Sequence, residues 1–174
     1  MAWNRRPRNT ALVTRRPRLS HTDAVSTRQW GLVSIGYEGR CAQDLIDTLA
    51  ELKVVTLVDV RLTPLSRKPG LSKTKLSASL AGVQIAYVHL PALGNPRDNR
   101  ESFREGVPAV GCVRFSKLLA RPASIAAMDQ LEALARDGLT AVLCFEREHE
   151  RCHRQVIVDE LQSRLGDSAT LLHA

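Results

Sequence analysis

The chain of 174 residues is long enough for one domain with a substantial core that needs no disulfide or metal staples. Hydrophobic residues at 44% and charged residues at 25% are typical of a globular protein, whereas aromatic residues at 4% are too few for a surface that stacks single-stranded nucleic acid. The net charge of +7 is concentrated in residues 1–30, which hold seven arginines against one acid and so carry +6 of it.

This first part of the chain, residues 1–30, is predicted to be a disordered, arginine-rich tail, because it contains Pro7 and Pro17 and lacks apolar periodicity. Such a basic arm is able to bind nucleic acid, and the alternative is a dispensable tail. The sequence has no apolar run as long as a membrane span and no apolar segment typical of a secretion signal. Four cysteines in a domain that is nearly neutral indicate free thiols. We therefore expect a cytoplasmic protein that does not contact membranes.

The rest of the chain alternates between short apolar runs, which predict strands, and longer amphipathic ones, which predict helices. The helix at 124–136 is expected to face the core with a stripe of Ile125, Met128, Leu131 and Leu134. The predicted elements, in chain order, are a strand at 31–36, a helix at 41–52, a strand at 54–60, a helix at 72–81, a strand at 84–90, a long loop at 91–108, helices at 110–119 and 124–136, a strand at 140–145, a helix at 152–165 and a strand at 169–173.

This alternation predicts an α/β fold: a single Rossmann-like domain over 31–174, with a mostly parallel sheet of four to five strands flanked by helices. In such sheets, ligands bind beyond the C-terminal ends of the strands. Residues that follow the predicted strand ends are therefore candidates for catalysis or ligand binding: Gly36, Tyr37, Glu38, Asp59, Arg61, Arg67, His89, Cys144, Glu146 and Arg147. We expect one cleft to be lined by Asp59, Arg61, His89, Glu146 and Cys152.

The densest chemistry lies in residues 143–154, between a predicted strand and a predicted helix. Cys152, His153 and Arg154 are placed near the helix N-terminus, where unpaired N–H groups attract anions and stabilise a thiolate. Cys152 is therefore the candidate for a reactive thiol. A nucleophilic cysteine needs a base, and either His89 or His153 is able to serve.

A zinc site is an alternative use of the same segment, with Cys144, His149, Cys152 and His153 as the four donors. Structural zinc sites usually take paired ligands from two separate knuckles, and the sequence has no second pair. No metal site is therefore predicted. The other two cysteines lie in helical stretches and are predicted to be small apolar fillers: Cys41 and Cys112.

Several candidates also have a purely structural interpretation. Asp59 is able simply to pair with Arg61, since a buried carboxylate needs a partner in either case. His89 is able to pack and hydrogen-bond within its strand, and Cys144 to belong to the core. The basic turn that contains Arg67 is able to clamp a phosphate or to be merely solvated. The residue types alone leave these alternatives open.

Six motifs, in order, resemble a mainly bacterial family called domain of unknown function 488, or DUF488. The motifs are SIGYEGR at 34–40, LVDVR at 57–61, PLSRKPG at 64–70, YVHLPALGNP at 87–96, LCFER at 143–147 and CHR at 152–154. The resemblance spans about residues 31–173. It implies a Rossmann-like α/β domain with two characteristic cysteines, which here are Cys144 and Cys152, and it implies no reaction.

The chain departs from the pattern of that family in three places, one of which is Leu71, where many members have an aromatic residue. Many members have an acid followed by proline where this chain has Glu148 and His149, and a serine or threonine helix cap often stands at the position of Cys41. His149 is therefore not implied to be a family feature.

Two functions are compatible with these residues. The first is a small enzyme whose ligand is anionic, with a phosphate or a nucleotide. In it, Cys152 is the nucleophile or redox centre, Asp59 or Glu146 orients a base and His89 carries a proton. The anion is held by Arg61, Arg67 and Arg154. The second is a non-catalytic module that binds a nucleotide or nucleic acid, with structural or metal-bound thiols. The sequence indicates no particular cofactor or oligomeric state.

Overall fold

The computed structural model of the protein describes Met1, residues 29–104 and residues 106–174. Most of the tail predicted at residues 1–30 therefore lies outside the described residues. Its last residue, Trp30, packs against the apolar core, and the Trp30 carbonyl accepts a hydrogen bond of 3.0 Å from the amide of Thr170. The packed part of the chain thus includes Trp30, one residue before the start predicted at Gly31.

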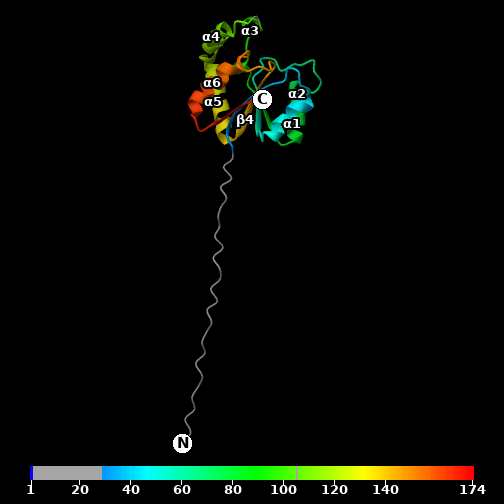
Figure 1. Ribbon diagram of the computed structural model, residues 1–174, viewed down its shortest axis with the longest axis vertical. Helices are drawn as coiled ribbons and strands as arrows, with labels where there is room; N and C mark the ends of the chain where they lie inside the picture. Colours follow the sequence, from blue (N-terminus) through cyan, green and yellow to red (C-terminus); the bar gives the residue numbers. More distant parts are fainter. Residues whose placement is uncertain (2–28, 105) are drawn as a thin grey trace.

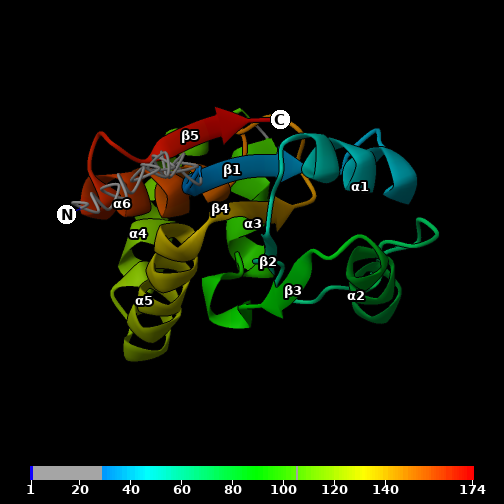
Figure 2. The same ribbon diagram turned by 90° about the horizontal axis from the view of Figure 1, so that it is seen from below.

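A single sheet of parallel strands lies among the helices (Figure 1), and its five strands follow the order β3-β2-β4-β1-β5 (Figure 2). The predicted Rossmann-like α/β fold is therefore confirmed. Strand β4 lies between β1 and β2. Cys144 of β4 pairs with Gly36 of β1, and Leu143 of β4 pairs with Asp59 of β2. Three strand ends thus meet at one edge. The strands are β1 (Gly31–Gly36), β2 (Thr56–Asp59), β3 (Ala86–His89), β4 (Leu139–Cys144) and β5 (Thr170–His173).

Helices cover both faces of the sheet, because successive strand residues point to opposite sides. Leu32 of β1 packs with the helices on one face, whereas Val33 and Ile35 pack with those on the other. Figure 2 shows the two layers on either side of β4 and β1. The first face carries α4 (Pro108–Leu119), α5 (Pro122–Asp137) and α6 (Arg154–Leu165), and the second carries α1 (Ala42–Glu51) and α2 (Lys73–Gly82).

The prediction of a long loop at 91–108 is wrong. This segment contains the short 3-10 helix η1 (Pro91–Leu93) and the helix α3 (Arg97–Arg104). Pro91 begins η1, Pro96 directly precedes α3 and Pro108 begins the next helix, so none of the three interrupts a helix, because the first turn of a helix does not use the N–H group that proline lacks. Phe103 anchors α3 from a buried position.

Two smaller expectations also need correction. Ile125 is 42% exposed, because α5 begins at Pro122 and turns Ser124, Met128 and Leu131 towards the core instead. Cys41 is not an apolar filler but an exposed helix cap, whose Sγ accepts the amide of Asp44 at 3.4 Å. It thus takes the capping role that serine or threonine usually fills. Among the described helices, none is long and apolar enough to cross a membrane.

Candidate functional site

The loop that follows β4 folds back against the end of β1. Gly36 permits this close approach, because a Cβ atom at residue 36 would lie 1.9 Å from the carbonyl oxygen of Glu146 and 2.8 Å from the Cα of Arg147. Two backbone hydrogen bonds hold the loop: Tyr37 N–H to the Cys144 carbonyl (3.3 Å) and Glu38 N–H to the Phe145 carbonyl (2.9 Å). These residues at the end of β1 hold the loop that follows β4, and we call Gly36, Tyr37 and Glu38 the template.

Three of the predicted ligand-binding residues belong to this template, namely Gly36, Tyr37 and Glu38. The carboxylate of Glu38 accepts the backbone amide of Arg147 at 3.1 Å, and the side chain of Glu38 is exposed. Gly36 contacts the Glu146 carbonyl directly, as described above. The structure thus places Gly36, Glu38 and Arg147 where they position the loop.

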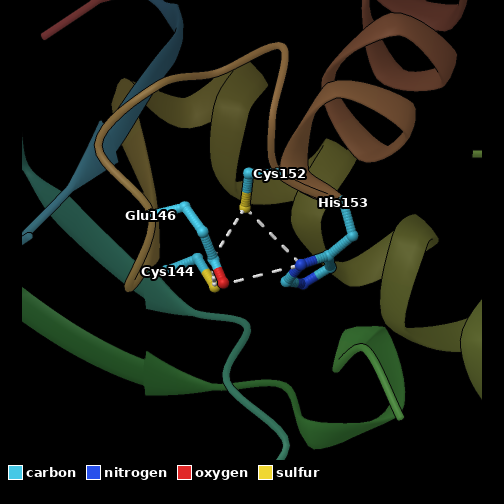
Figure 3. Close-up of side chains that lie close together, drawn as sticks. All are labelled: Cys144, Glu146, Cys152 and His153. Carbon is cyan, nitrogen blue, oxygen red and sulfur yellow. Dashed lines mark hydrogen bonds between the residues drawn. The ribbon is translucent and has the colours of Figure 1, made fainter. Parts of the chain in front are cut away.

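Four side chains from the ends of this loop meet beneath it (Figure 3). Cys144 ends β4, Glu146 follows two residues later, and Cys152 and His153 lead into α6. Their donor atoms all lie within 4.8 Å of one another. The Sγ atoms of Cys144 and Cys152 lie 3.1 and 3.2 Å from Oε2 of Glu146, and 3.9 and 3.6 Å from Nδ1 of His153. We call these four residues the Cys144 cluster.

Burial and hydrogen bonds set the charges in the Cys144 cluster. A hydrogen bond with Cys152, burial and the electrostatic interaction with Cys152 raise the pKa of Cys144 well above its ordinary value. Burial alone would raise the pKa of Glu146, but hydrogen bonds from the Cys144 thiol, its own backbone amide and the Cys152 thiol lower it. Glu146 is therefore ionised near neutral pH, while Cys144 keeps its proton. Cys152, predicted to be a reactive thiol, is only 1% exposed.

A pocket of about 190 Å³ opens directly onto the Cys144 cluster. Cys144, Glu146 and His153 line it, whereas Cys152 lies behind them. Its other walls come from the segments that follow β1, β2 and β4, from Asn95 and from α3: Tyr37, Arg61, Leu62, Thr63, Leu65, Asn95, Arg100, Arg104 and Phe145. The predicted cleft therefore contains Arg61 and Glu146, but Asp59, His89 and Cys152 do not line it.

Arg100 and Arg104 are lining residues that the sequence analysis missed. They lie four residues apart, which places them on the same face of α3. Arg100 is held by a hydrogen bond of 3.1 Å from Nε to the carbonyl of Asn95. The sequence does place these two arginines four residues apart. This spacing puts them on one face only if the segment is helical, whereas the sequence pattern predicts a loop there.

A second cluster lies at the end of β2, and its members satisfy one another. Asp59 is completely buried, and Arg61 donates to it through Nε at 2.8 Å and through Nη2. The Tyr87 hydroxyl donates to Asp59 at 2.6 Å, and Nη1 of Arg61 donates to the Tyr37 hydroxyl at 3.2 Å. We call these four residues the Asp59 cluster. Its geometry matches the structural interpretation in which Asp59 pairs with Arg61.

The same contacts shift the pKa values in the Asp59 cluster. Burial by itself lowers the pKa of Arg61, but the hydrogen bond and the charge of Asp59 outweigh it and raise this pKa. Burial and the hydrogen bond to Asp59 raise the pKa of Tyr87. Arg61 thus remains charged, with most of its guanidinium donors already in use.

The remaining candidates lie apart from the pocket lining. Nε2 of His89 contacts the carbonyl of Arg61 at 2.9 Å, and its Nδ1 lies 3.4 Å from Nζ of Lys73. Arg67 is exposed, and its turn is held by Lys68, which donates to the carbonyls of Tyr37 and Arg40. Neither His89 nor Arg67 lines the pocket over the Cys144 cluster.

Arg154 and His149 form hydrogen bonds that hold the loop in place. Arg154 is fully buried and donates from Nη2 to the carbonyl of Glu146 at 2.7 Å. His149 lies outside the Cys144 cluster, because its Nδ1 is hydrogen-bonded to the hydroxyl of Ser34 at 2.8 Å. Burial, followed by the nearby charges of His173 and Arg154, lowers the pKa of His149 to about 4.

The fold and the site together define an α/β protein with an all-parallel, Rossmann-like sheet and a cysteine-containing polar cluster at its C-terminal edge. The model of the family described as domain of unknown function DUF488 matches residues 42–161. The chain therefore belongs to the DUF488 family, as the resemblance of its motifs implied. No curated protein and no solved structure gives a significant match.

Proposed function

We propose that this protein is an enzyme that acts on a small anionic ligand bound in the pocket over the Cys144 cluster. The observation that carries this proposal is the composition of the pocket, which has Arg100 and Arg104 on one wall and Cys144, Glu146 and His153 on another. A cationic wall opposite a set of titratable groups is the arrangement expected where a ligand is both held and transformed.

The arginines of α3 support an anionic ligand that carries a phosphate or a carboxylate. A guanidinium group binds such oxygens through two parallel N–H donors, which makes the contact strong and directional. Arg61 also lines the pocket, but Asp59 already occupies most of its donors. Arg100 and Arg104 therefore replace Arg61, Arg67 and Arg154 as the proposed anion-binding residues.

The size of the pocket limits the part of the ligand that enters it. Its volume of about 190 Å³ is below the roughly 300–1,000 Å³ of pockets that enclose drug-sized molecules. We therefore propose that the phosphate or carboxylate group enters, together with the few atoms next to it. Larger parts, such as a nucleoside, would extend out of the pocket.

Glu146 is the residue proposed to act on the ligand. It is the only carboxylate among the described residues that line this pocket, and hydrogen bonds lower its pKa so that it is ionised at neutral pH. A carboxylate in this position is able to accept a proton from a bound ligand.

The four free cysteines fit a cytoplasmic location, where thiols stay reduced.

The anion site is tested with inorganic phosphate and isothermal titration calorimetry. The Arg100→Gln, Arg104→Gln double variant should bind phosphate at least about tenfold more weakly, because a hydrogen bond to a charged group contributes roughly 1.5–3 kcal/mol. Arg97→Gln is the matched control, since Arg97 is exposed on the same helix but does not line the pocket. Equal phosphate affinity in the double variant and the wild-type protein would contradict the proposal.

Catalysis is tested separately from binding. Wild-type protein and Glu146→Gln are incubated with a panel of phosphorylated and carboxylated small molecules, and products are followed by mass spectrometry. We expect a product with the wild-type protein and its loss in the variant, with phosphate affinity retained. Phosphate binding without turnover of any compound would instead support the non-catalytic binding module.

A further inference from the structure

We propose that the Cys144 cluster is a zinc site, in which Cys144, Cys152, His153 and Glu146 supply the four ligand atoms. The inference deepens the proposed function, because three of these residues line the same pocket, but it depends only on the geometry and chemistry of the cluster. It departs from the sequence analysis, which considered zinc with His149 as a donor and did not favour it. In the structure, Glu146 takes the place of His149.

The distances within the cluster match the edges of a tetrahedron around zinc. Bonds of about 2.0–2.3 Å from zinc to nitrogen, oxygen and sulfur place neighbouring ligand atoms roughly 3.3–3.8 Å apart. Four of the six edges lie within about 0.2 Å of this range, at 3.1 and 3.2 Å from the sulfurs to Glu146 and 3.6 and 3.9 Å from the sulfurs to His153, and the other two are at most 4.8 Å. An ion can therefore be bound with small side-chain adjustments and without a change in the backbone.

The types of donor favour zinc over magnesium or calcium. Two cysteine sulfurs and an imidazole nitrogen are soft or intermediate ligands, whereas magnesium and calcium prefer sites made of oxygen alone. The sequence has no second knuckle to supply another ligand pair, but the fold brings two ligand pairs together from separate elements. The end of β4 supplies one half of the site and the start of α6 the other, and the template at Gly36 holds the loop between them.

A bound cation also gives the carboxylate of Glu146 a partner. Among residues 29–104 and 106–174, Glu146 forms no ion pair, and the side chains that donate to its carboxylate are two thiols, which are weak donors. A half-buried carboxylate of this kind is stabilised by a stronger partner. Zinc supplies it, and the thiols release their protons as they become ligands.

Arg154 completes the balance of charge. Zinc with two thiolates, one carboxylate and a neutral imidazole carries a net charge of −1. Arg154 is fully buried, contacts the Glu146 carbonyl at 2.7 Å and has no carboxylate partner among the described side chains. Its single positive charge neutralises the loaded site. This gives a physical reason for a buried arginine at the start of α6.

Glu146 is the ligand that we propose to exchange with substrate. Catalytic zinc sites keep three protein ligands and one position for water or substrate, whereas structural sites are closed. Cys152 is enclosed, while Glu146 faces the pocket with Cys144 and His153. An anion held by Arg100 and Arg104 would approach the metal from this side and replace the carboxylate. The freed Glu146 would then lie beside the ligand as a base.

The closing experiment uses Co²⁺ as a spectroscopic probe of the full-length protein. Protein treated with a chelator and a reductant is titrated with Co²⁺, and the absorption spectrum is recorded. A tetrahedral site with two thiolates should give intense visible d–d bands and a near-ultraviolet thiolate-to-cobalt band, with one ion per chain. Addition of Zn²⁺ should remove both features, since zinc binds such sites more tightly.

Cysteine variants locate the probe. Cys144→Ser and Cys152→Ser should weaken Co²⁺ binding by more than the roughly 10–100-fold loss typical of outer-shell substitutions. The same change in Cys41→Ser and Cys112→Ser should leave the spectrum unchanged, because neither residue belongs to the cluster. The wild-type titration needs no variant, so a variant that fails to fold does not prevent the test.

The outcomes separate this inference from the proposed function. Absence of thiolate-to-cobalt absorption in the reduced wild-type protein would overturn the zinc site, as would a spectrum retained in both Cys144→Ser and Cys152→Ser. Phosphate binding that depends on Arg100 and Arg104 would survive either result. The converse result is a cobalt spectrum from a protein whose phosphate affinity is the same with and without Arg100 and Arg104. That result would support the metal site and contradict the anionic ligand.

Discussion

The Asp59 cluster and the Cys144 cluster both border the same pocket, but they differ in how their polar groups are satisfied. In the Asp59 cluster, a buried carboxylate receives a guanidinium and a hydroxyl at hydrogen-bond distance. In the Cys144 cluster, the side chains that donate to the carboxylate of Glu146 are two thiols, at 3.1 and 3.2 Å. Within the described residues, the carboxylate of the first cluster has strong side-chain donors, whereas the carboxylate of the second has weak ones and is available to a metal ion or a ligand.

This difference indicates which cluster stabilises the fold and which is available to a ligand. A buried ion pair with all its hydrogen bonds resists rearrangement, because removal of either partner leaves an unpaired charge. A carboxylate held by weak donors is able to exchange them for a metal ion or a substrate at lower cost. Position at the C-terminal edge of the sheet is shared by both clusters and therefore does not distinguish them.

The largest effect expected from this comparison is on stability. Asp59→Asn should lower the free energy of unfolding by about 3–5 kcal/mol, because it leaves the buried guanidinium of Arg61 without a counter-charge. Glu146→Gln in metal-free protein should cost about 1 kcal/mol or less, since the side-chain donors to Glu146 are two weakly donating thiols. Urea denaturation of both variants measures the difference.

The matched control for this pair is Glu132→Gln, which makes the same change in the surface ion pair with Arg136. It should change the free energy of unfolding by at most about 1 kcal/mol. If Glu146→Gln proved as destabilising as Asp59→Asn, the two clusters would be equally structural and the comparison would fail.

An intermediate effect is expected at the template that holds the Cys144 cluster in place. Gly36→Ala puts a Cβ atom into the backbone of Glu146, so the loop must shift, and a loss of about 1–3 kcal/mol in stability should follow. Co²⁺ affinity should fall as well, because the loop carries Glu146. Urea denaturation and cobalt titration measure the two effects.

Gly82→Ala is the control for this substitution. A Cβ atom at residue 82 would lie in open space, so the free energy of unfolding of this variant should be unchanged or up to about 1 kcal/mol higher. A Gly36→Ala protein with wild-type stability and cobalt affinity would show that the contact between β1 and the loop does not position the cluster.

The smallest expected effect is the pH dependence that His149 contributes on the inner side of the loop. Its pKa is about 4 in the folded protein and near 6.5 in the unfolded chain, so the unfolded state binds the proton more readily. The stability that depends on neutral His149 is thus present above pH 6.5 and is lost as pH falls towards 4. Urea denaturation of wild-type protein and His149→Gln across this window measures it. The variant should show the weaker decline, and an identical decline in both proteins would contradict the assignment.

Much of the fold could be predicted from local patterns in the sequence. The runs GLVSIG and VVTLVDV are apolar and β-branched, which suits strands buried on both faces, and β1 and β2 form there. The segment at 91–108 misled the prediction, because its prolines are equally compatible with a loop and with the first turns of η1 and α4.

The site was predicted less completely, because its members come together only through the path of one loop. The sequence places Cys144, Cys152 and His153 near a strand end and a helix start, and the structure brings them together there. It does not show that His149 turns away to Ser34 while Glu146 turns inward. Both positions follow from the path of the loop, which packs against Gly36 at Glu146 and against Ser34 at His149.

The sequence by itself determined the α/β class, the order along the chain of the strands and of every helix except η1 and α3, and the edge of the sheet at which polar residues gather. These follow from the spacing of apolar residues and from the tendency of parallel strands to end on one side. Only the tertiary structure decided that Asp59 and Arg61 neutralise each other, that α3 brings Arg100 and Arg104 to the pocket, and that Glu146 joins the two cysteines. Those outcomes depend on distances of a few ångströms between residues far apart in the chain, and residue spacing does not specify such distances.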